Sequence, residues 1–196
     1  MAEPARLLRR THQGQELQGR VDLRVLSGCC RRAVPQSVRA GRIKAQIPLY
    51  TAFTIDELSL PLQKENAIGV PGAQQWVNDL PNAENKKFVE DYRKKYTGLR
   101  PTFYGAQSYD AANLINSAVI AVKGDTSKKD EMRAEMKKVS FKSVRGPFKY
   151  GNNQIPIQNF YLQDVVKDAD GQLSLKTVAT IVKDDQDRFH DKCPMK

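Results

Sequence analysis

Apolar side chains recur with a helical period in three stretches of the chain after residue 43. Asn82 precedes the first stretch and Ser127 the third, and both residue types favour helix starts because their side chains accept backbone hydrogen bonds. Gly98 and Gly124 follow the first and second stretches, and glycine commonly ends a helix. The pattern predicts helices over 82–97, 104–123 and 127–138.

The second predicted helix carries one apolar stripe. Residues three or four positions apart lie on the same side of a helix, and six apolar residues follow that spacing. They are Tyr109, Ala112, Ile115, Ala118, Val119 and Val122.

Short apolar runs outside these helices predict strands. Residues 54–66 are expected to form a loop and a short helix interrupted at Pro61. The segment Asp168–Gly171 separates the last two strand-like runs, and an Asp-Gly pair in that place favours a hairpin. We expect strands over 47–53, 67–70, 148–150, 159–166 and 173–182, with a turn at Pro71–Gly72 after the second. Strands mixed with helices of this length indicate an α/β protein.

The charge of the chain is distributed unevenly. The formal net charge is +10 over 196 residues, which on its own would suggest a nucleic-acid partner. Residues 1–42 hold nine arginines, no lysine and three acids, which leaves residues 43–196 only mildly basic. In that longer part, acids and bases are interspersed as on a solvated helix face. We therefore expect no nucleic-acid partner for residues 43–196.

The segment 1–42 differs in kind from the rest of the chain. It scatters arginine, glutamine and glycine without a sustained period, which is typical of disorder. Shifting the reading frame of residues 21–41 by one nucleotide, with permitted codons, gives an apolar strand, a Pro-Gly turn and an amphipathic helix that continue into Ile43. We interpret residues 1–42 as an out-of-frame or disordered basic segment, and a genuine basic arm is the alternative.

Signals for catalysis, metals and cofactors are missing from the sequence. Three cysteines and two histidines have no metal-ligand or disulfide spacing. No nucleophile motif and no phosphate-binding loop is present, and no apolar run is long enough to cross a bilayer. We expect no enzyme activity, no metal and no cofactor.

Three ordered stretches carry a resemblance to a known family. They are Pro48–Asp56, then Asn85–Ala112 with its FYGAQSYDAA segment, and finally Phe141–Phe148 with Ile157–Leu162 after it. In order and spacing they resemble the C-terminal part of periplasmic solute-binding proteins of the branched-chain amino-acid (leucine-binding) class. The third stretch most resembles members associated with aromatic acids.

The resemblance implies an α/β fold, namely an incomplete type I periplasmic-binding-protein fold with Rossmann-like three-layer lobes. Residues 43–196 would contribute to both lobes, with a hinge near 67–76. Such proteins capture a small carboxylate solute, an amino acid or an aromatic acid, in the interlobe cleft. They deliver it to the membrane permease of an ABC importer, and the implied location is the periplasm, although no signal peptide is visible in this chain.

The resemblance also implies a binding site without chemistry, where apolar side chains cover the ligand and polar groups hold its ends. We expect Phe53 and Thr54 at a strand end and Tyr104 at a helix start to contact the ligand, and a helix start favours a carboxylate. Ala52 stands where amino-acid-binding relatives place an acid for the ligand's ammonium, so Asp56 is expected to serve instead.

A structural interpretation of each candidate stays open. Phe53 and Tyr104 fit the core as well as a cleft, and Asp56, like Asp110, fits a turn or helix start. Two alternative functions also stay open, a ligand-sensing receptor module of the same fold and a truncated, non-functional remnant.

Overall fold

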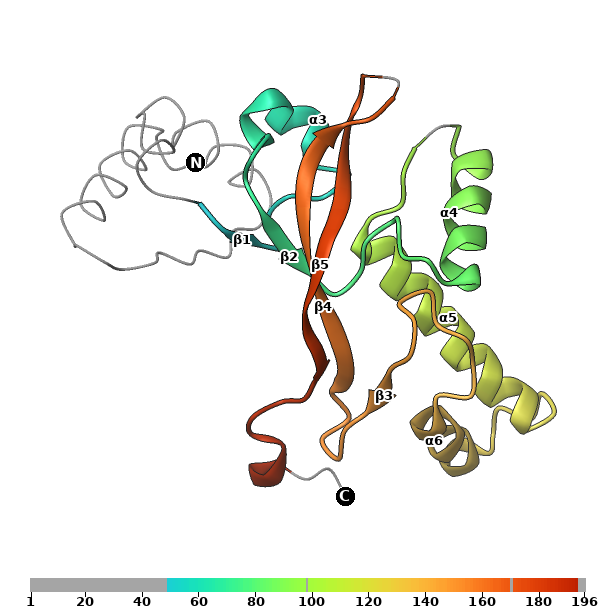
Figure 1. The fold of residues 1–196 in the computed structure, drawn as a ribbon. Helices are drawn as coiled ribbons and strands as arrows, with labels where there is room; N and C mark the ends of the chain where they lie inside the picture. The colour runs from blue at the N-terminus through green and yellow to red at the C-terminus, as the bar shows by residue number, and fades with distance from the viewer. Residues whose placement is uncertain (1–48, 98, 170, 194–196) are drawn as a thin grey trace, which may run out of the picture. The chain divides into compact units, whose positions relative to one another are not determined.

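The computed structural model describes residues 49–97, 99–169 and 171–193. The chain divides into two compact units (Figure 1). Among the described residues, the first unit comprises 49–74 and 162–178, and the second comprises 75–161 and 179–193. The chain therefore passes from one unit to the other three times.

The first unit is built from short elements that follow one another closely. They are β1 (Thr51–Ala52), α3 (Leu60–Gln63), the 3-10 helix η2 (Lys64–Ala67), β2 (Gly72–Gln74) and the adjoining parts of β4 (Pro156–Lys167) and β5 (Leu173–Asp185). β1 pairs with β2 in parallel, with Thr51 opposite Gly72, and β2 lies next to β4. The core is an aliphatic cluster of Ile55, Leu60, Ala67, Val70, Val165 and Leu175.

In this unit, one strand prediction is confirmed only in part and another is wrong. The predicted strand 47–53 ends at Ala52, because Phe53 has a φ of 54° and turns the chain; residues 47 and 48 lie outside the described part. The predicted strand 67–70 is instead the end of η2 and a turn in which Gly69 has a φ of 69°. The strand that follows is β2, at the position predicted as a turn.

Pro61 is the second residue of a helix and does not interrupt it. It lies in the first turn of α3, where the backbone nitrogen would have no helical acceptor and the ring fits without a clash. The expected short helix is therefore present, with its proline at the start.

The second unit contains three longer helices. They are α4 (Ala83–Lys95), α5 (Phe103–Ala121) and α6 (Lys129–Lys138), followed by β3 (Lys149–Tyr150), parts of β4 and β5, and the short η3 (His190–Lys192). Buried Trp76 anchors α4 through a 2.7 Å hydrogen bond from its indole nitrogen to Asn85 Oδ1 and an edge contact with Phe88. Phe88 in turn contacts Tyr109 of α5, which ties the two helices together.

All three predicted helices are confirmed, but their starts differ from the prediction. Asn82 precedes α4, yet its amide donates to the carbonyls of Ser143 and Val144 instead of capping the helix. The third helix begins two residues after Ser127, whose hydroxyl donates to Asp125. Gly124 ends the α5 region with a φ of 83°, as expected, whereas Gly98 lies outside the described residues.

The C-terminal hairpin is also confirmed. β4 and β5 pair with each other, and β3 pairs antiparallel with the start of β4. At the turn, the Asp168 N–H donates to the carbonyl of Gln172 and Gly171 adopts a φ of 73°, which glycine tolerates at little cost. Both long strands run from one unit into the other.

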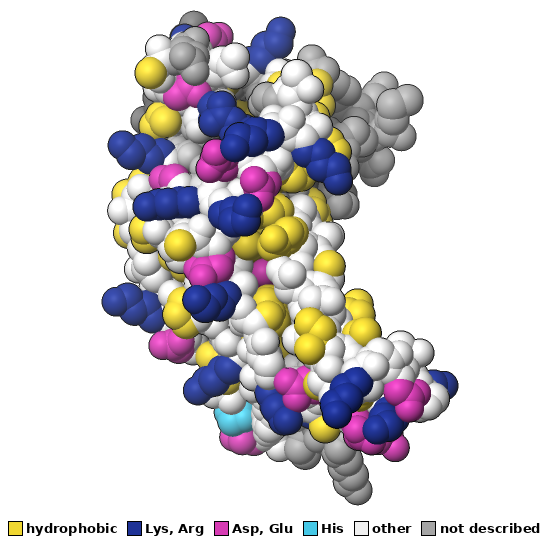
Figure 2. Space-filling view, turned by 90° about the vertical axis from the view of Figure 1, so that its right-hand side faces the viewer, with side chains coloured by type: hydrophobic (Ala, Val, Ile, Leu, Met, Phe, Trp, Pro, Cys, Tyr) yellow, Lys and Arg dark blue, Asp and Glu magenta, His cyan; other side chains and the backbone are white. Residues whose placement is uncertain are grey.

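The charged surface is mixed in sign. Figure 2 shows lysine and arginine side chains interspersed with aspartate and glutamate on one face of the molecule. Within the described ranges, none of the helices combines the length and the apolar character needed to cross a bilayer.

Candidate functional site

Three of the expected ligand contacts lie in the turn that follows β1. Thr54 is buried, and its hydroxyl donates to the carbonyl of Ala52 at 3.0 Å. The carbonyl of Thr54 accepts from Gln63 Nε2 at 3.2 Å, a bond that reaches across the short helix. Phe53 is half-buried and has the left-handed backbone conformation described above. The turn is therefore rigidly positioned by its own backbone and by α3.

The side chain of Asp56 forms hydrogen bonds within the same turn. Its Oδ1 accepts from the Ser59 N–H at 2.7 Å, while its own N–H donates to Ser59 Oγ at 3.0 Å. This reciprocal pair resembles a capping box and leads into α3. The carboxylate is buried and holds the local fold, in line with the turn interpretation of this residue.

Buried amides brace the strands next to this turn. Gln74 Nε2 donates to Gln163 Oε1 at 2.7 Å, and Gln163 Nε2 donates to the carbonyl of Ile55 at 3.2 Å. Gly72 leaves room for this arrangement, since a Cβ there would lie 3.0 Å from Gln163 Nε2. No local sequence pattern predicts this network, because the bonded residues are 89 and 108 positions apart.

Tyr104, the fourth expected contact, belongs to the second unit. It follows Thr102, whose hydroxyl caps α5 by accepting from the Gly105 N–H at 3.4 Å. Tyr104 is 50% exposed, and its ring tilts against that of Phe103. The structure thus groups Phe53, Thr54 and Asp56 in one unit and holds Tyr104 at the start of a helix in the other.

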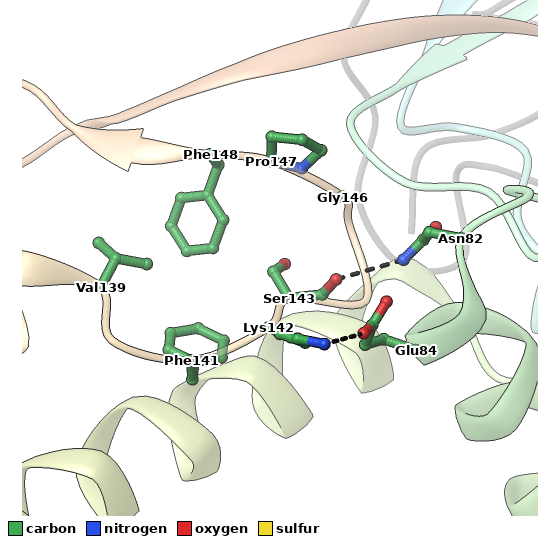
Figure 3. A pocket seen from close by; sticks show the side chains of 9 residues that line it. All are labelled: Asn82, Glu84, Val139, Phe141, Lys142, Ser143, Gly146, Pro147 and Phe148. Atoms are coloured by element: carbon green, nitrogen blue, oxygen red, sulfur yellow. Dashed lines mark hydrogen bonds and ion pairs between the residues drawn. The ribbon is translucent and has the colours of Figure 1, made fainter.

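A pocket of about 430 Å³ lies in the second unit, between the start of α4 and the loop before β3 (Figure 3). Its apolar wall holds Phe141 and Phe148, whose ring centroids are 5.9 Å apart. Lys142 Nζ lies 3.6 Å from Glu84 Oε1 at the same pocket. Its lining residues are Asn82, Glu84, Val139, Phe141, Lys142, Ser143, Gly146, Pro147 and Phe148. None of the four expected ligand contacts lines this pocket.

A buried ion pair holds the loop that forms the pocket. Asp110 lies in the middle of α5, not at a helix start, and is 1% exposed. One carboxylate oxygen accepts from Ser143 Oγ at 2.5 Å and Arg145 Nε at 2.9 Å, and the other accepts from the Val144 N–H at 3.1 Å. Asp110 therefore joins α5 to three consecutive residues of the loop.

Arg145 extends this network toward the strands. Its Nη1 donates to Gln158 Oε1 at 2.9 Å, and its guanidinium lies 4.2 Å from the centre of the Phe148 ring. Planar stacking together with directed hydrogen bonds suits arginine and not lysine. Through this network the Ser-Val-Arg-Gly-Pro-Phe stretch is held against α5, a structural role that the sequence pattern did not predict.

Across the described ranges, no group of three or more histidine, cysteine, aspartate or glutamate side chains is placed to hold a metal ion. The groups that surround the turn and the pocket are aromatic rings, hydroxyls, amides, one paired lysine and the carboxylates of Asp56 and Glu84.

Comparison with known proteins identifies the family. The profile described as periplasmic binding protein matches residues 31–172, which is more than half of the chain. The chain belongs to this periplasmic binding protein family. The resemblance predicted from the sequence is therefore confirmed.

Curated and solved relatives agree with this assignment. A protein named Leu/Ile/Val-binding protein homolog 6, from Brucella abortus, is 33% identical over 131 residues, covering 65% of this chain and 33% of its own length. A solute-binding protein of an ABC transporter from R. palustris, solved with benzoate, is 28% identical with a TM-score of 0.73, and the match covers 91% of this chain and 49% of that one.

The predicted fold class is also confirmed. An ABC transporter substrate-binding protein from Sphaerobacter thermophilus has a TM-score of 0.83 at 21% identity, over 94% of this chain and 50% of that one. The family member described here thus spans about a third of the curated relative and half of each solved relative.

Proposed function

We propose that this chain is part of the substrate-binding component of an ABC importer that captures a small carboxylate solute. The family match over residues 31–172 carries the proposal. The names of two relatives, a Leu/Ile/Val-binding homolog and a benzoate-bound solute-binding protein, point to the same broad class of ligand, a small molecule with one carboxylate.

Within that class, the residues favour an aromatic acid over an α-amino acid. An amino-acid ligand needs an acidic partner for its ammonium group, and Ala52 in β1 offers none. Asp56 is the alternative expected from the sequence, but it is buried and one of its oxygens already accepts a 2.7 Å hydrogen bond from the Ser59 N–H. An aromatic acid makes no such demand, because only its carboxylate carries charge.

Four residues remain the proposed ligand contacts. Phe53 and Tyr104 would cover an aromatic ring and Thr54 would offer backbone and hydroxyl groups. Asp56, whose Oδ1 is bonded to the Ser59 N–H, would use its other oxygen to accept from a hydroxyl of the ligand if there is one. The start of α5 beside Tyr104 supports carboxylate binding, because backbone N–H groups there point toward the helix end.

The proposed partner is the membrane permease of the importer, and the proposed location is the periplasm. Both follow from the family, whose members act outside the cytoplasmic membrane. A sensory module of the same fold is the second candidate function, and it requires a signalling or membrane segment elsewhere in the same gene product. A non-functional remnant is the third.

Isothermal titration calorimetry on the complete gene product, freed of bound ligand, tests the proposal. The titrants are benzoate, 4-hydroxybenzoate and leucine. We expect saturable heat with at least one benzoate and little with leucine, and Tyr104→Ala should weaken that binding by about tenfold or more. Tyr96→Ala is the matched control, since Tyr96 is similarly exposed at 45% but is not a proposed contact. Absence of heat with every titrant contradicts the proposal.

A further inference from the structure

The pocket between the start of α4 and the loop before β3 is not used by the proposed function. Its volume of about 430 Å³ falls within the range of about 300–1,000 Å³ that is typical of small-molecule sites. All of its lining residues lie between positions 82 and 148, so the pocket belongs entirely to the second unit. Because none of the proposed ligand contacts is among them, the pocket is a candidate site for a different ligand.

The two walls of the pocket are fixed to each other. Asn82, which precedes α4, donates through Nδ2 to the carbonyls of Ser143 and Val144 in the facing loop. Buried Asp110 holds the same loop through the hydroxyl of Ser143 and the Nε of Arg145. A pocket whose walls are already held in place requires little ordering when a ligand binds, which favours affinity.

One residue of the pocket wall has a strained backbone. Val139 ends α6 with a φ of 53° and a ψ of 51°, which is the left-handed conformation. This conformation is unfavourable for a side chain branched at Cβ, because the Cβ crowds the following carbonyl oxygen. Strained residues cluster at ligand-binding positions, and Val139 lines the pocket beside Phe141. The strain therefore supports a binding role for this wall.

The pocket has an aromatic end and a charged end (Figure 3). At the aromatic end, the rings of Phe141 and Phe148 meet edge to face, with their planes at 69°. The guanidinium of Arg145 lies over the Phe148 ring and keeps that ring in place. Glu84 and Lys142 form the charged end. A ligand with a flat apolar body and one polar head fits this division.

The charged end offers one acceptor and one donor that are not hydrogen-bonded to each other. Lys142 Nζ lies 3.6 Å from Glu84 Oε1, which is longer than an N–H···O hydrogen bond. The lysine side chain is 86% exposed, so the pair is weak and a ligand group can enter between its members. A ligand head with a net charge would be attracted by one member and repelled by the other. A neutral head that both donates and accepts satisfies both members.

We propose that this pocket binds a neutral aromatic molecule with a carboxamide head. The carboxamide oxygen accepts from Lys142 Nζ, its amide N–H donates to the Glu84 carboxylate, and the ring packs against the aromatic end. A neutral head also loses less hydration on entering the pocket than a carboxylate or an ammonium group does. The proposal goes beyond the proposed function and does not rest on it, because it concerns another site and another class of ligand.

NMR spectroscopy of the isotope-labelled 196-residue chain tests the pocket, with benzamide as the probe. We expect the backbone N–H signals of Phe141, Lys142 and Phe148 to shift saturably as benzamide is added. Benzoate has the same ring, but its head carries a negative charge and has no donor for Glu84. At these signals benzoate should therefore bind about tenfold more weakly than benzamide, or less tightly still.

Two glutamate variants separate a specific contact from a general effect of charge. Glu84→Ala should raise the Kd of benzamide by about tenfold or more, because a hydrogen bond to a charged group is lost. Glu131→Ala is the matched control and should leave that Kd unchanged. Glu131 also lies in the first turn of a helix and 3.6 Å from a lysine Nζ, but it does not line the pocket. Circular dichroism should show the same helix content in both variants.

Three results would overturn the proposal. In the first, benzamide shifts no signal of residues 141–148. In the second, Glu84→Ala and Glu131→Ala bind benzamide with equal Kd. In the third, benzoate binds this pocket as tightly as benzamide does. The proposed function succeeds or fails separately, because its ligand is detected at the signals of Phe53, Thr54 and Tyr104.

Discussion

Removal of the Asp110 carboxylate should destabilise the second unit strongly. In Asp110→Ala the hydroxyl of Ser143, the N–H of Val144 and the Nε of Arg145 lose their acceptor together. Deleting one member of a buried ion pair costs about 3–5 kcal/mol, because the remaining charge stays in a poorly solvated place.

The structure places the expected loss near the lower end of that range. The Arg145 side chain is 9% exposed, retains Gln158 as a partner and still stacks on Phe148. We therefore expect the free energy of unfolding to fall by about 3 kcal/mol in Asp110→Ala. The Asp110→Ala/Arg145→Met double variant should lose less than the sum of the two single variants, since no unpaired charge is left.

Urea denaturation followed by circular dichroism measures these values. The matched control is Asp130→Ala, which removes an aspartate–arginine pair that is exposed, with Asp130 at 96%. Such surface pairs contribute little, so the control should keep the midpoint of the unchanged chain. A loss in Asp110→Ala no larger than in Asp130→Ala would refute the assignment of Asp110 as the tether of the pocket loop.

Three further predictions follow from single contacts. Gly72→Ala should lower the free energy of unfolding by about 1–3 kcal/mol, measured by thermal melting, because the added Cβ presses on Gln163 and disturbs its hydrogen bonds; an unchanged melting temperature contradicts this. Asp56→Ala should cost about 1 kcal/mol by loss of the bond from the Ser59 N–H, and urea midpoints report it. The hydrogen bond from Lys138 lowers the pKa of Glu135. The stability that this bond contributes is therefore present above the pKa of an unfolded glutamate and is lost as the pH falls through the lowered pKa of Glu135. NMR titration of the Glu135 carboxyl measures that pKa, and a value at or above that of a free glutamate would contradict the prediction.

The longer elements could be predicted from the sequence because their signals are local. Charge and apolar period marked α4 and α6, and Gly124 marked the end of the α5 region. The hairpin followed from the glycine at position 171 between two β-rich runs. In each case neighbouring residues decide the structure, and a window of ten to twenty residues contains the information.

The short strands depended on distant partners and were not predictable in this way. Residues 67–70 are apolar because Ala67 and Val70 fill the core, and not because they pair in a sheet. Gly72–Gln74 becomes a strand because β1 lies beside it in parallel. Pairing with a distant strand decides whether such a segment is a strand or a turn, and the local sequence pattern carries no information about that pairing.

The candidate site was predicted only in part for the same reason. Phe53 follows a strand and Tyr104 lies in the first turn of a helix, as expected from the sequence, and their role in binding stays a prediction. The pocket loop was missed, because the bonds of Asp110 span 33 to 35 positions. A buried aspartate inside an otherwise uncharged helix is the signal that could have found it.

DNA sequencing of the gene through codons 1–46 and upstream tests most sharply whether this chain is one part of a longer solute-binding protein. We expect a one-base correction to open a frame that continues upstream, encodes the rest of the periplasmic-binding-protein fold, and begins with a signal peptide. If the present frame stands and no upstream frame encodes further periplasmic-binding-protein sequence, the chain is not part of a longer solute-binding protein, and the basic segment 1–42 is a genuine arm whose partner has to be sought.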